Sequence, residues 1–162
     1  MARLALLVAA VWAAGCATAP TLVHAQSGAT STLAELQGRP LVITFWAEWC
    51  KPCLTQQPVL AEVAREVSPD ILVIPVYFRP RPDDGLVGWM RDQPADFTGA
   101  VCWANWPFLR KFDLTAIPKT FIFGRNGKQI EELKGMLTEE QLPIYRGALL
   151  RAMATPFQPA GT

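Results

Sequence analysis

The chain of 162 residues contains a single histidine, His24, and it carries no excess of charge of either sign. Its 15 basic and 14 acidic residues give a formal net charge of +1, and no basic run or stripe is present. Proteins that bind nucleic acid or anionic membrane surfaces concentrate Lys and Arg on one face, so neither partner is indicated. The chain also lacks internal repeats and low-complexity blocks. Its hydrophobic content of 51% is typical of one globular domain.

The N-terminal 25 residues have the composition of an export signal. Arg3 is followed by an apolar stretch, residues 4–14, that is too short for a comfortable membrane span. Removal of residues 1–25 would leave 14 basic and 14 acidic residues and no histidine. For such a mature domain, Cys–His and Ser–His catalysis would be excluded.

Two processing sites compete within this leader. Ordinary cleavage after Ala25 makes residues 1–25 a signal peptide. The residues before Cys16 resemble a bacterial lipobox, which makes residues 1–15 a lipoprotein signal and 16–30 a flexible tether with a lipid on Cys16. An uncleaved anchor is a third alternative. Each version places the fold in the periplasm or cell envelope, where disulfides persist.

Cys50 and Cys53 are separated by two residues, at the junction between a predicted buried strand and a predicted helix. The first turn of a helix presents unpaired N–H groups and the positive end of the helix dipole, so a thiolate there is stabilised. The sequence therefore predicts Cys50 as the nucleophile, with the charge of Lys51 nearby. Cys53, one turn inside the helix, is the more buried second thiol. Pro52 lies early in the helix, where its missing N–H costs nothing.

Two other interpretations of this cysteine pair are weaker. A zinc site needs four ligands, and only Cys102 remains in the body of the chain. A purely structural disulfide would close a ring of four residues, which restricts the unfolded chain little and so stabilises little. A redox function is favoured.

The pattern along the rest of the chain predicts alternating strands and helices. Pro58 falls inside a helix, where it predicts a kink, and Pro75 falls inside a strand, where it suggests a sheet edge or a bulge. We expect a short helix or turn over 31–38, strands over 41–46, 71–78 and 100–103, helices over 52–67, 86–90 and 107–112, a hairpin over 121–134, a last helix to 154 and a loose tail over 156–162. This order predicts an α/β fold with a mixed sheet covered on both faces.

Residues 45–53, Phe-Trp-Ala-Glu-Trp-Cys-Lys-Pro-Cys, resemble the thioredoxin active-site signature. Pro58 matches the helix-kinking proline of that superfamily, and residues 117–120 resemble its cis-proline segment. With the export leader and residues 36–40, the chain looks like the TlpA-like branch of exported thioredoxins. The resemblance implies a thioredoxin-like three-layer sandwich over residues 31–155.

The resemblance also implies a reaction. Cys50 would attack a substrate disulfide and Cys53 would resolve the mixed disulfide. Backbone groups before the cis-proline would pair with the substrate chain, as in strand addition. The redox-active pair needs no metal or other cofactor, and the partners implied are protein disulfides and an upstream membrane electron donor. The residues implied to bind substrate or shape the site are Trp49, Lys51, Pro52, Ile117 and Pro118.

The chain departs from the family pattern at three positions. Thr44 stands where thioredoxins usually have a buried Asp, and Gln56 stands where the TlpA-like branch often has Glu. Such an acid is thought to take the proton of the resolving thiol, so the general base for Cys53 is left open between water and Glu48. Lys119 stands where the cytochrome c maturation branch tends to carry Glu.

The lead hypothesis is a thiol–disulfide oxidoreductase of the cell envelope that works as a reductant. A disulfide oxidant or isomerase is the first alternative, because Lys51 stabilises the Cys50 thiolate and so favours the reduced protein. A non-catalytic metal carrier that uses Cys50 and Cys53 is the second. Cys102 is expected to be a buried thiol on a short strand, with a third redox thiol or an intermolecular link as the alternative.

Overall fold

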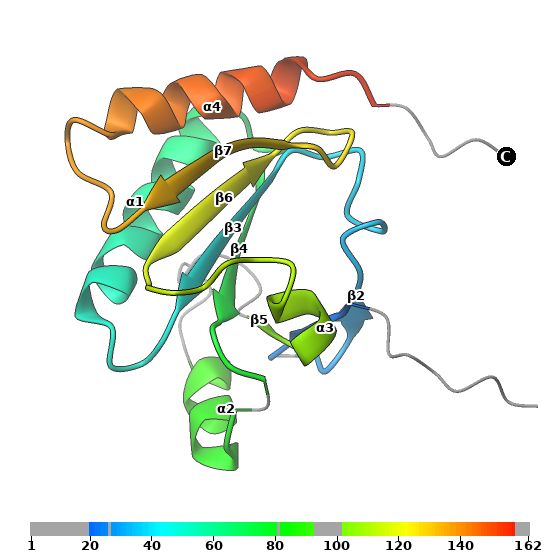
Figure 1. Ribbon diagram of the computed structural model, residues 1–162, viewed down its shortest axis with the longest axis vertical. Helices are drawn as coiled ribbons and strands as arrows, with labels where there is room; N and C mark the ends of the chain where they lie inside the picture. The colour runs from blue at the N-terminus through cyan, green and yellow to red at the C-terminus, as the bar shows by residue number, and fades with distance from the viewer. Residues whose placement is uncertain (1–19, 26, 81, 93–101, 158–162) are drawn as a thin grey trace, which may run out of the picture.

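The structure is a computed structural model that describes residues 20–25, 27–80, 82–92 and 102–157 (Figure 1). The helices in this part of the chain are α1 (Lys51–Val67), α2 (Asp84–Arg91), α3 (Trp106–Leu109) and α4 (Leu142–Ala154). The strands are β1 (Leu22–His24), β2 (Thr30–Ser31), β3 (Leu41–Trp46), β4 (Leu72–Tyr77), β5 (Cys102–Ala104), β6 (Lys119–Phe123) and β7 (Gln129–Lys134). None of these helices is both long and apolar enough to cross a bilayer.

The strands form one mixed sheet in the order β2-β1-β5-β4-β3-β6-β7. The strand β3 lies inside this sheet, parallel to β4 and antiparallel to β6. All six of its residues are buried, as expected for a strand with helices on both faces. Figure 1 shows α4 lying across β6 and β7, and α1 beside it. The predicted α/β fold with a mixed sheet is confirmed.

Alternate residues of β3 belong to two different cores, because successive side chains of a strand point to opposite faces. Val42 packs with α1 and α4, in a cluster that includes Leu60 and Tyr145. Ile43 and Phe45 pack on the other face, against α3 and the aromatic segment that follows it. The molecule therefore has three layers, with α1 and α4 on one side of the sheet and α3 on the other.

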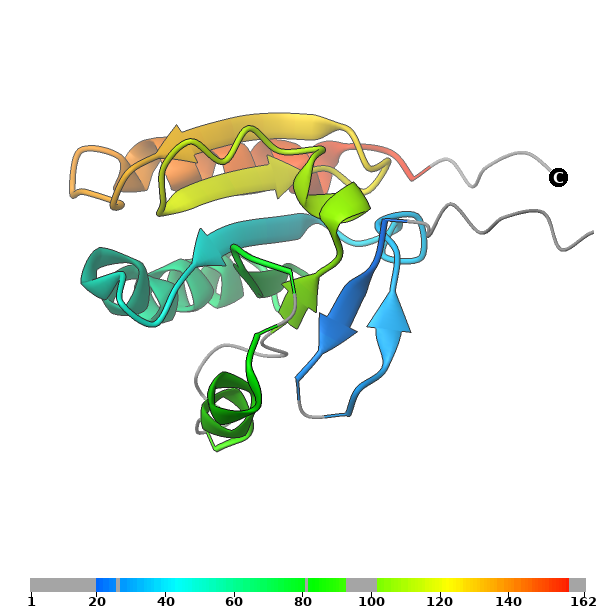
Figure 2. The ribbon, with the colours of Figure 1, turned by 60° about the horizontal axis from the view of Figure 1, so that its bottom comes forward.

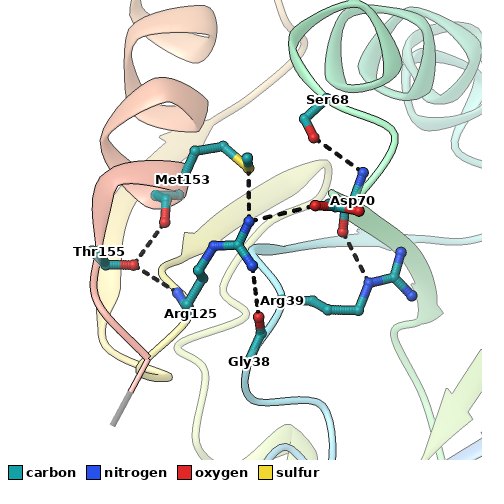
Figure 3. Close-up of polar contacts among 8 residues, drawn as sticks. Gly38, Arg39, Ser68, Asp70, Arg125, Met153 and Thr155 are labelled. Atoms are coloured by element: carbon teal, nitrogen blue, oxygen red, sulfur yellow. Dashed lines mark hydrogen bonds and ion pairs between the residues drawn. The ribbon is translucent and has the colours of Figure 1, made fainter.

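At the end of the sheet far from Cys50, Arg125 joins segments that are distant in the sequence (Figure 3). Its Nη1 donates a hydrogen bond of 2.9 Å to the carbonyl of Gly38, and its Nη2 lies 3.5 Å from a carboxylate oxygen of Asp70. Its backbone N–H donates to the hydroxyl of Thr155 at 2.7 Å. These contacts join the β6–β7 turn to the segments before β3 and β4 and after α4.

The sheet begins earlier than the sequence indicates. Leu22–His24, assigned to the leader or the tether, pairs antiparallel with β5, and His24 lies opposite Cys102. Leu22 and Ala25 are buried. The inference that the folded part has no histidine is therefore wrong for this structure. Strands of three and two residues carry too little periodicity to be distinguished from the end of a signal sequence.

Both internal prolines are accommodated within their elements. The helix α1 continues through Pro58 to Val67. Pro75 lies in β4, which is inside the sheet and not at its edge. The neighbouring strand β5 pairs only with Val76 and Tyr77, so Pro75 lies beyond the part of β4 that β5 covers. A residue without an N–H therefore fits here, although the strand is internal.

Two neighbouring glutamines of α1 are buried, but only one is hydrogen bonded. The Nε2 of Gln56 donates to the Thr44 hydroxyl at 3.3 Å, and its Oε1 accepts from the backbone N–H of Leu137 at 2.9 Å. Gln57 is 1% exposed, and neither its Nε2 nor its Oε1 has a hydrogen-bond partner in the described structure. A buried polar group without a partner loses its hydration without compensation.

We therefore expect opposite effects on stability from the same change at adjacent positions. Gln57→Leu should raise the free energy of unfolding by about 1 kcal/mol, because it removes an uncompensated amide. Gln56→Leu should lower it by about 1–3 kcal/mol, because it leaves the Leu137 N–H without a partner and removes one of the two hydrogen bonds that the Thr44 oxygen accepts. Urea unfolding of the oxidised proteins measures both changes. A Gln57→Leu variant as unstable as Gln56→Leu would contradict this account.

Candidate active site

The cysteine pair lies where β3 leads into α1. Cys50 is the N-cap residue of α1, and its backbone N–H donates to the carbonyl of Ala47 at 3.0 Å. Cys53 lies in the first turn of the helix. The two residues form a disulfide, with their Cα atoms 5.3 Å apart. Cys50 is 5% exposed and Cys53 is 1% exposed, so Cys50 is the sulfur nearer to solvent.

An aromatic cluster lies beneath the disulfide. Both cysteines pack with Trp46, Tyr77 and Met90, all of them buried. The Trp46 ring contacts that of Tyr77 at a centroid distance of 5.7 Å. Met90 comes from α2, so this helix covers the end of the sheet at which the cysteines lie (Figure 2). Water is therefore excluded from the inner side of the pair, and the outer side alone is accessible.

Three of the predicted site residues surround Cys50 at the surface. Trp49 is 60% exposed, and its ring meets that of Phe78 edge-on at 5.5 Å. Lys51 and Pro52 are also exposed. The first turn of α1 contains no acidic residue. The positive end of the helix dipole and the Lys51 ammonium therefore act on Cys50 without a carboxylate in that turn to oppose them.

The segment before β6 reaches the same cluster. Ile117 is half-buried and packs against the cluster that contains Cys50 and Cys53. The peptide bond between Ile117 and Pro118 is cis, and Pro118 is buried. Its carbonyl accepts a hydrogen bond of 3.0 Å from the N–H of Gly135. The structure thus brings together the two predicted parts of the site, which are more than sixty residues apart in the sequence.

A neutral hydrogen-bonded network contains Thr44 and Gln56, the two positions at which the resemblance implies an acid. The hydroxyl of Thr120 donates to that of Thr44 at 3.1 Å, and the same Thr44 oxygen accepts from Gln56. These three side chains are buried, and none is ionisable. Gln56 follows Cys53 by three residues, so the two lie on neighbouring positions of one helix face. The network contains no carboxylate, so it provides no acidic side chain that could accept the proton of Cys53.

Glu48, the other group considered as a base, is engaged with Tyr77. Burial, and then the nearby Glu48 carboxylate with its hydrogen bond, raise the pKa of Tyr77. Glu48 is exposed and lies at the surface before Cys50, whereas Cys53 is buried. Lys119, the third departure from the family pattern, is buried and pairs with Glu132, with Nζ 3.1 Å from Oε1.

The structure reveals a polar contact that sequence reasoning missed. The Cys102 sulfur lies 3.5 Å from His24 Nδ1, and His24 Nε2 lies 3.0 Å from the Ser31 hydroxyl. Cys102 is fully buried, and burial raises its pKa to about 12. The thiol is therefore neutral near pH 7, as expected for a small buried group. Only the pairing of β1 with β5 brings His24 to it, and no local pattern in the sequence signals that pairing.

The residues that the structure describes contain no group of three or more His, Cys, Asp or Glu side chains arranged to hold a metal ion. Residues 29–146 match the family model of a thioredoxin-like domain. The chain belongs to this thioredoxin-like family. The match begins just before β2 and ends within α4, so it includes both cysteines and the segment around Pro118.

Two named relatives and one solved structure illustrate the similarity. The chain is 25% identical over 113 residues to the thiol-disulfide oxidoreductase ResA of Bacillus thuringiensis subsp. konkukian, covering 70% of this chain and 65% of that protein. It is 28% identical over 108 residues to the thiol:disulfide interchange protein DsbE of Xylella fastidiosa, covering 67% and 53%. The structure of a thio-disulfide isomerase from Thermus thermophilus superposes with a TM-score of 0.61 at 26% identity, covering 84% of this chain and 93% of the other. The matches thus span less than two thirds of the two named relatives.

We expect Cys102 to be unreactive in the folded protein. At pH 8 the iodoacetamide adduct at Cys102 should be absent from the folded oxidised chain and should form readily in urea, because burial keeps this thiol protonated and inaccessible. Peptide-level mass spectrometry follows Cys102 separately from Cys16. Alkylation of Cys102 in the folded chain at the rate of a model thiol would contradict this prediction.

The raised pKa also predicts how stability depends on pH. The unfolded thiol ionises near its ordinary pKa of about 8.5, whereas the folded thiol keeps its proton until about pH 12. The contribution of Cys102 to the free energy of unfolding should therefore be complete below about pH 8 and decline as pH rises toward 12. Unfolding measured from pH 7 to 11 should show a shallower decline for Cys102→Ala than for the parent chain. If the free energy of unfolding declined equally with pH in the two proteins, the raised pKa of Cys102 would be refuted.

Proposed function

We propose that the chain is a thiol–disulfide oxidoreductase of the cell envelope that reduces disulfides in exported proteins. The single observation that carries the proposal is the position of the Cys50–Cys53 pair, with Cys50 at the N-cap of α1 and nearer to solvent than Cys53, which lies in the first turn of the helix. The names of the relatives ResA and DsbE support a thiol–disulfide reaction. Protein disulfides are the proposed substrates, and no cofactor beyond the cysteine pair is proposed.

The reaction starts from the reduced pair. The Cys50 thiolate attacks one sulfur of a substrate disulfide, the substrate S–S bond breaks, and the other substrate sulfur leaves as a thiolate that takes up a proton. Cys53 loses its proton and attacks the Cys50 sulfur of the mixed disulfide. The Cys50–Cys53 disulfide forms and the second substrate thiol is released. Two electrons pass to the substrate, and an upstream donor of the membrane must return them.

The helix terminus explains why Cys50 attacks first. Its thiolate receives the N-terminal dipole of α1 and the charge of Lys51, both of which lower a thiol pKa. Trp49 is exposed directly before Cys50 with its ring against that of Phe78, and Ile117 packs against the cluster that contains both cysteines. We propose that backbone groups of Ile117 pair with the substrate chain, which holds its disulfide over Cys50. Lys51, Pro52 and Pro118 shape the surface around this contact.

The alternative function is that of a disulfide oxidant or isomerase. The environment of Cys50 is the observation that favours it. Stabilisation of the Cys50 thiolate stabilises the reduced protein, which raises the reduction potential of the pair. The equilibrium potential against glutathione separates the alternatives. A value near that of thioredoxin supports the reductant, and a value near that of strongly oxidising proteins overturns it.

We further propose export with a lipid on Cys16. Cleavage after Ala25 would remove Leu22–His24, the strand that pairs with β5 and contributes the buried Leu22. Processing at Cys16 leaves this strand in the chain. The fold thus supports the lipoprotein interpretation over ordinary signal cleavage, and mass spectrometry of the mature N-terminus distinguishes the two.

Trapping of mixed disulfides tests the proposed reaction. Cys53→Ser should accumulate covalent adducts with envelope proteins, because the second step is blocked, and it should lose insulin reduction to the uncatalysed rate. Cys50→Ser should lose the activity and trap nothing. A Cys53→Ser/Cys102→Ala variant is the matched control and should trap as well as Cys53→Ser. Adducts that disappear with Cys102 rather than with Cys50 would overturn the proposal.

The neutral network beneath Cys53 predicts a gain from a carboxylate. Gln56→Glu places a buried acid whose pKa desolvation raises toward neutrality, which suits it to accept the Cys53 proton. We expect resolution of the mixed disulfide to become at least about tenfold faster near pH 7, a modest part of what a general base supplies. Single-turnover kinetics between pH 5 and 9 measures this rate. Gln56→Leu is the control without a base, and an equal acceleration by Leu would contradict proton transfer.

A further inference from the structure

A groove with arginines at its rim lies beside the proposed catalytic surface. We call it the arginine groove: it has a volume of about 360 Å³ and lies between the residues that follow β4, helix α3 and the segment that follows α3. Phe78 forms part of its wall, and the ring of this residue is in contact with that of Trp49. Because Trp49 directly precedes Cys50, a continuous aromatic surface joins the groove to the disulfide.

The floor of the arginine groove is apolar and rigid. Leu109 and Phe112 line it, and both are buried in the core on the α3 side of the sheet. The Phe112 ring packs against those of Phe45 and Phe121, with centroid distances of 4.9 and 4.8 Å. A side chain that entered the groove would therefore meet preformed apolar surface, which lowers the entropic cost of binding.

The rim of the groove is cationic. Arg79 and Arg110 line it from opposite segments, both are exposed, and no acidic residue is among the lining residues. In the described structure neither arginine forms an ion pair. The Arg79 guanidinium carbon lies 4.8 Å from the centroid of the Phe78 ring, so stacking holds this charge over the wall of the groove. The acid nearest to Arg110 in the sequence, Asp113, lines a separate hollow beside Pro118. The acid nearest to Arg79, Asp83, is the N-cap residue of α2 and accepts a hydrogen bond from the N–H of Leu86.

Trp106 adds a feature typical of protein interfaces. It is 60% exposed, and it lines both the arginine groove and a second hollow of about 600 Å³. Trp and Arg are the residues most enriched among those that dominate binding energy at interfaces. Exposed Trp49 and Trp106, with the two arginines between apolar walls, therefore favour a polypeptide partner.

We propose that the arginine groove is a docking site for an acidic-apolar segment of the substrate polypeptide, so that the enzyme prefers disulfides flanked by such a segment. An aromatic or branched aliphatic side chain enters the apolar floor, and adjacent Asp or Glu side chains pair with Arg79 and Arg110. This inference rests on the proposed function, since the segment belongs to the chain whose disulfide Cys50 attacks. Because Phe78 lines the groove and its ring contacts that of Trp49, the residue before Cys50, we place the segment a few residues from the substrate cysteine.

The two parts of the groove make different contributions. Burial of the apolar side chain supplies affinity. The exposed arginines supply discrimination and a faster encounter, both of which weaken as salt is added. The preference for an acidic segment should therefore be larger in 20 mM than in 300 mM salt, whereas the preference for an apolar side chain should persist.

Two synthetic peptides test the proposal. Each carries the same internal disulfide, followed five residues later by Phe-Glu-Glu in one peptide and by Phe-Lys-Lys in the other. We expect the wild-type protein to reduce the acidic peptide with a kcat/KM about tenfold higher in 20 mM salt, and Arg79→Glu/Arg110→Glu to reverse this preference. Arg65→Glu/Lys128→Glu makes the same change in net charge at exposed positions outside the groove, and it should keep the wild-type preference.

Trp106→Ala tests the apolar contact separately. It should raise KM several-fold for the Phe-Glu-Glu peptide and leave KM unchanged for a Ser-Glu-Glu peptide. Reduction of bis(2-hydroxyethyl) disulfide, which is too small to reach the groove, should be the same for all these variants and reports that each is folded. Equal kcat/KM for the two charged peptides, or a preference that survives Arg79→Glu/Arg110→Glu, would overturn the docking site. Failure of the wild-type protein to reduce the small disulfide would instead overturn the proposed function.

Discussion

The pairing of β3 with strands on both sides is the constraint on which the site depends. Because β4 is parallel to β3, both strands end at the same edge of the sheet, and Phe78 follows β4 there. Because β6 is antiparallel, it begins at that edge, and Ile117 and Pro118 precede it. The chain after β3 turns into α1 between these two segments. One pattern of hydrogen bonds thus brings Cys50, an aromatic wall and the segment around Pro118 together.

The buried network of Thr44, Gln56 and Thr120 is polar but uncharged. The Thr44 hydroxyl accepts from both Gln56 and Thr120, and Gln56 also accepts from the backbone before α4. This arrangement joins α1, β3, β6 and the segment before α4 without burying a carboxylate. Burial of a charge would require a shifted pKa or a partner, so the amide provides the connection at lower cost. The neutral side chain of Gln56 also provides no carboxylate to take the proton of Cys53. The residue that stabilises the core therefore also affects the rate at which Cys53 resolves the mixed disulfide.

The features that the sequence predicts correctly are those with a local signal. Three features are each visible within a few residues: the apolar run of β3, the hairpin of β6 and β7, and the cysteines between strand and helix. An acidic cap is also a local signal, since Asp83 and Asp84 both precede the apolar residues of α2; the structure shows that Asp83 is the cap and accepts from the N–H of Leu86 at 2.8 Å. The family follows from several such signals in the right order.

The features that the sequence does not predict depend on which distant segments meet. The pairing of β1 with β5 places His24 beside Cys102, 78 residues away. The difference between Gln56 and Gln57 depends on what each side chain meets across the core, not on its position in the helix. The arginine groove is built from three separate segments, none of which is unusual by itself. In each case the feature depends on which distant segments of the chain come into contact, and a pattern within a short stretch of sequence does not specify those contacts.

The early start of the sheet has a geometric consequence for a lipid-anchored form of the chain. Leu22 lies six positions after Cys16, and a fully extended chain of six residues spans about 20 Å. With a lipid on Cys16, the start of β1 could not move farther than this from the headgroups, and the molecule would face the membrane with a restricted set of orientations. Encounters with a membrane-embedded donor would then occur within a thin layer next to the bilayer, and substrates deeper in the envelope would have to diffuse to the surface.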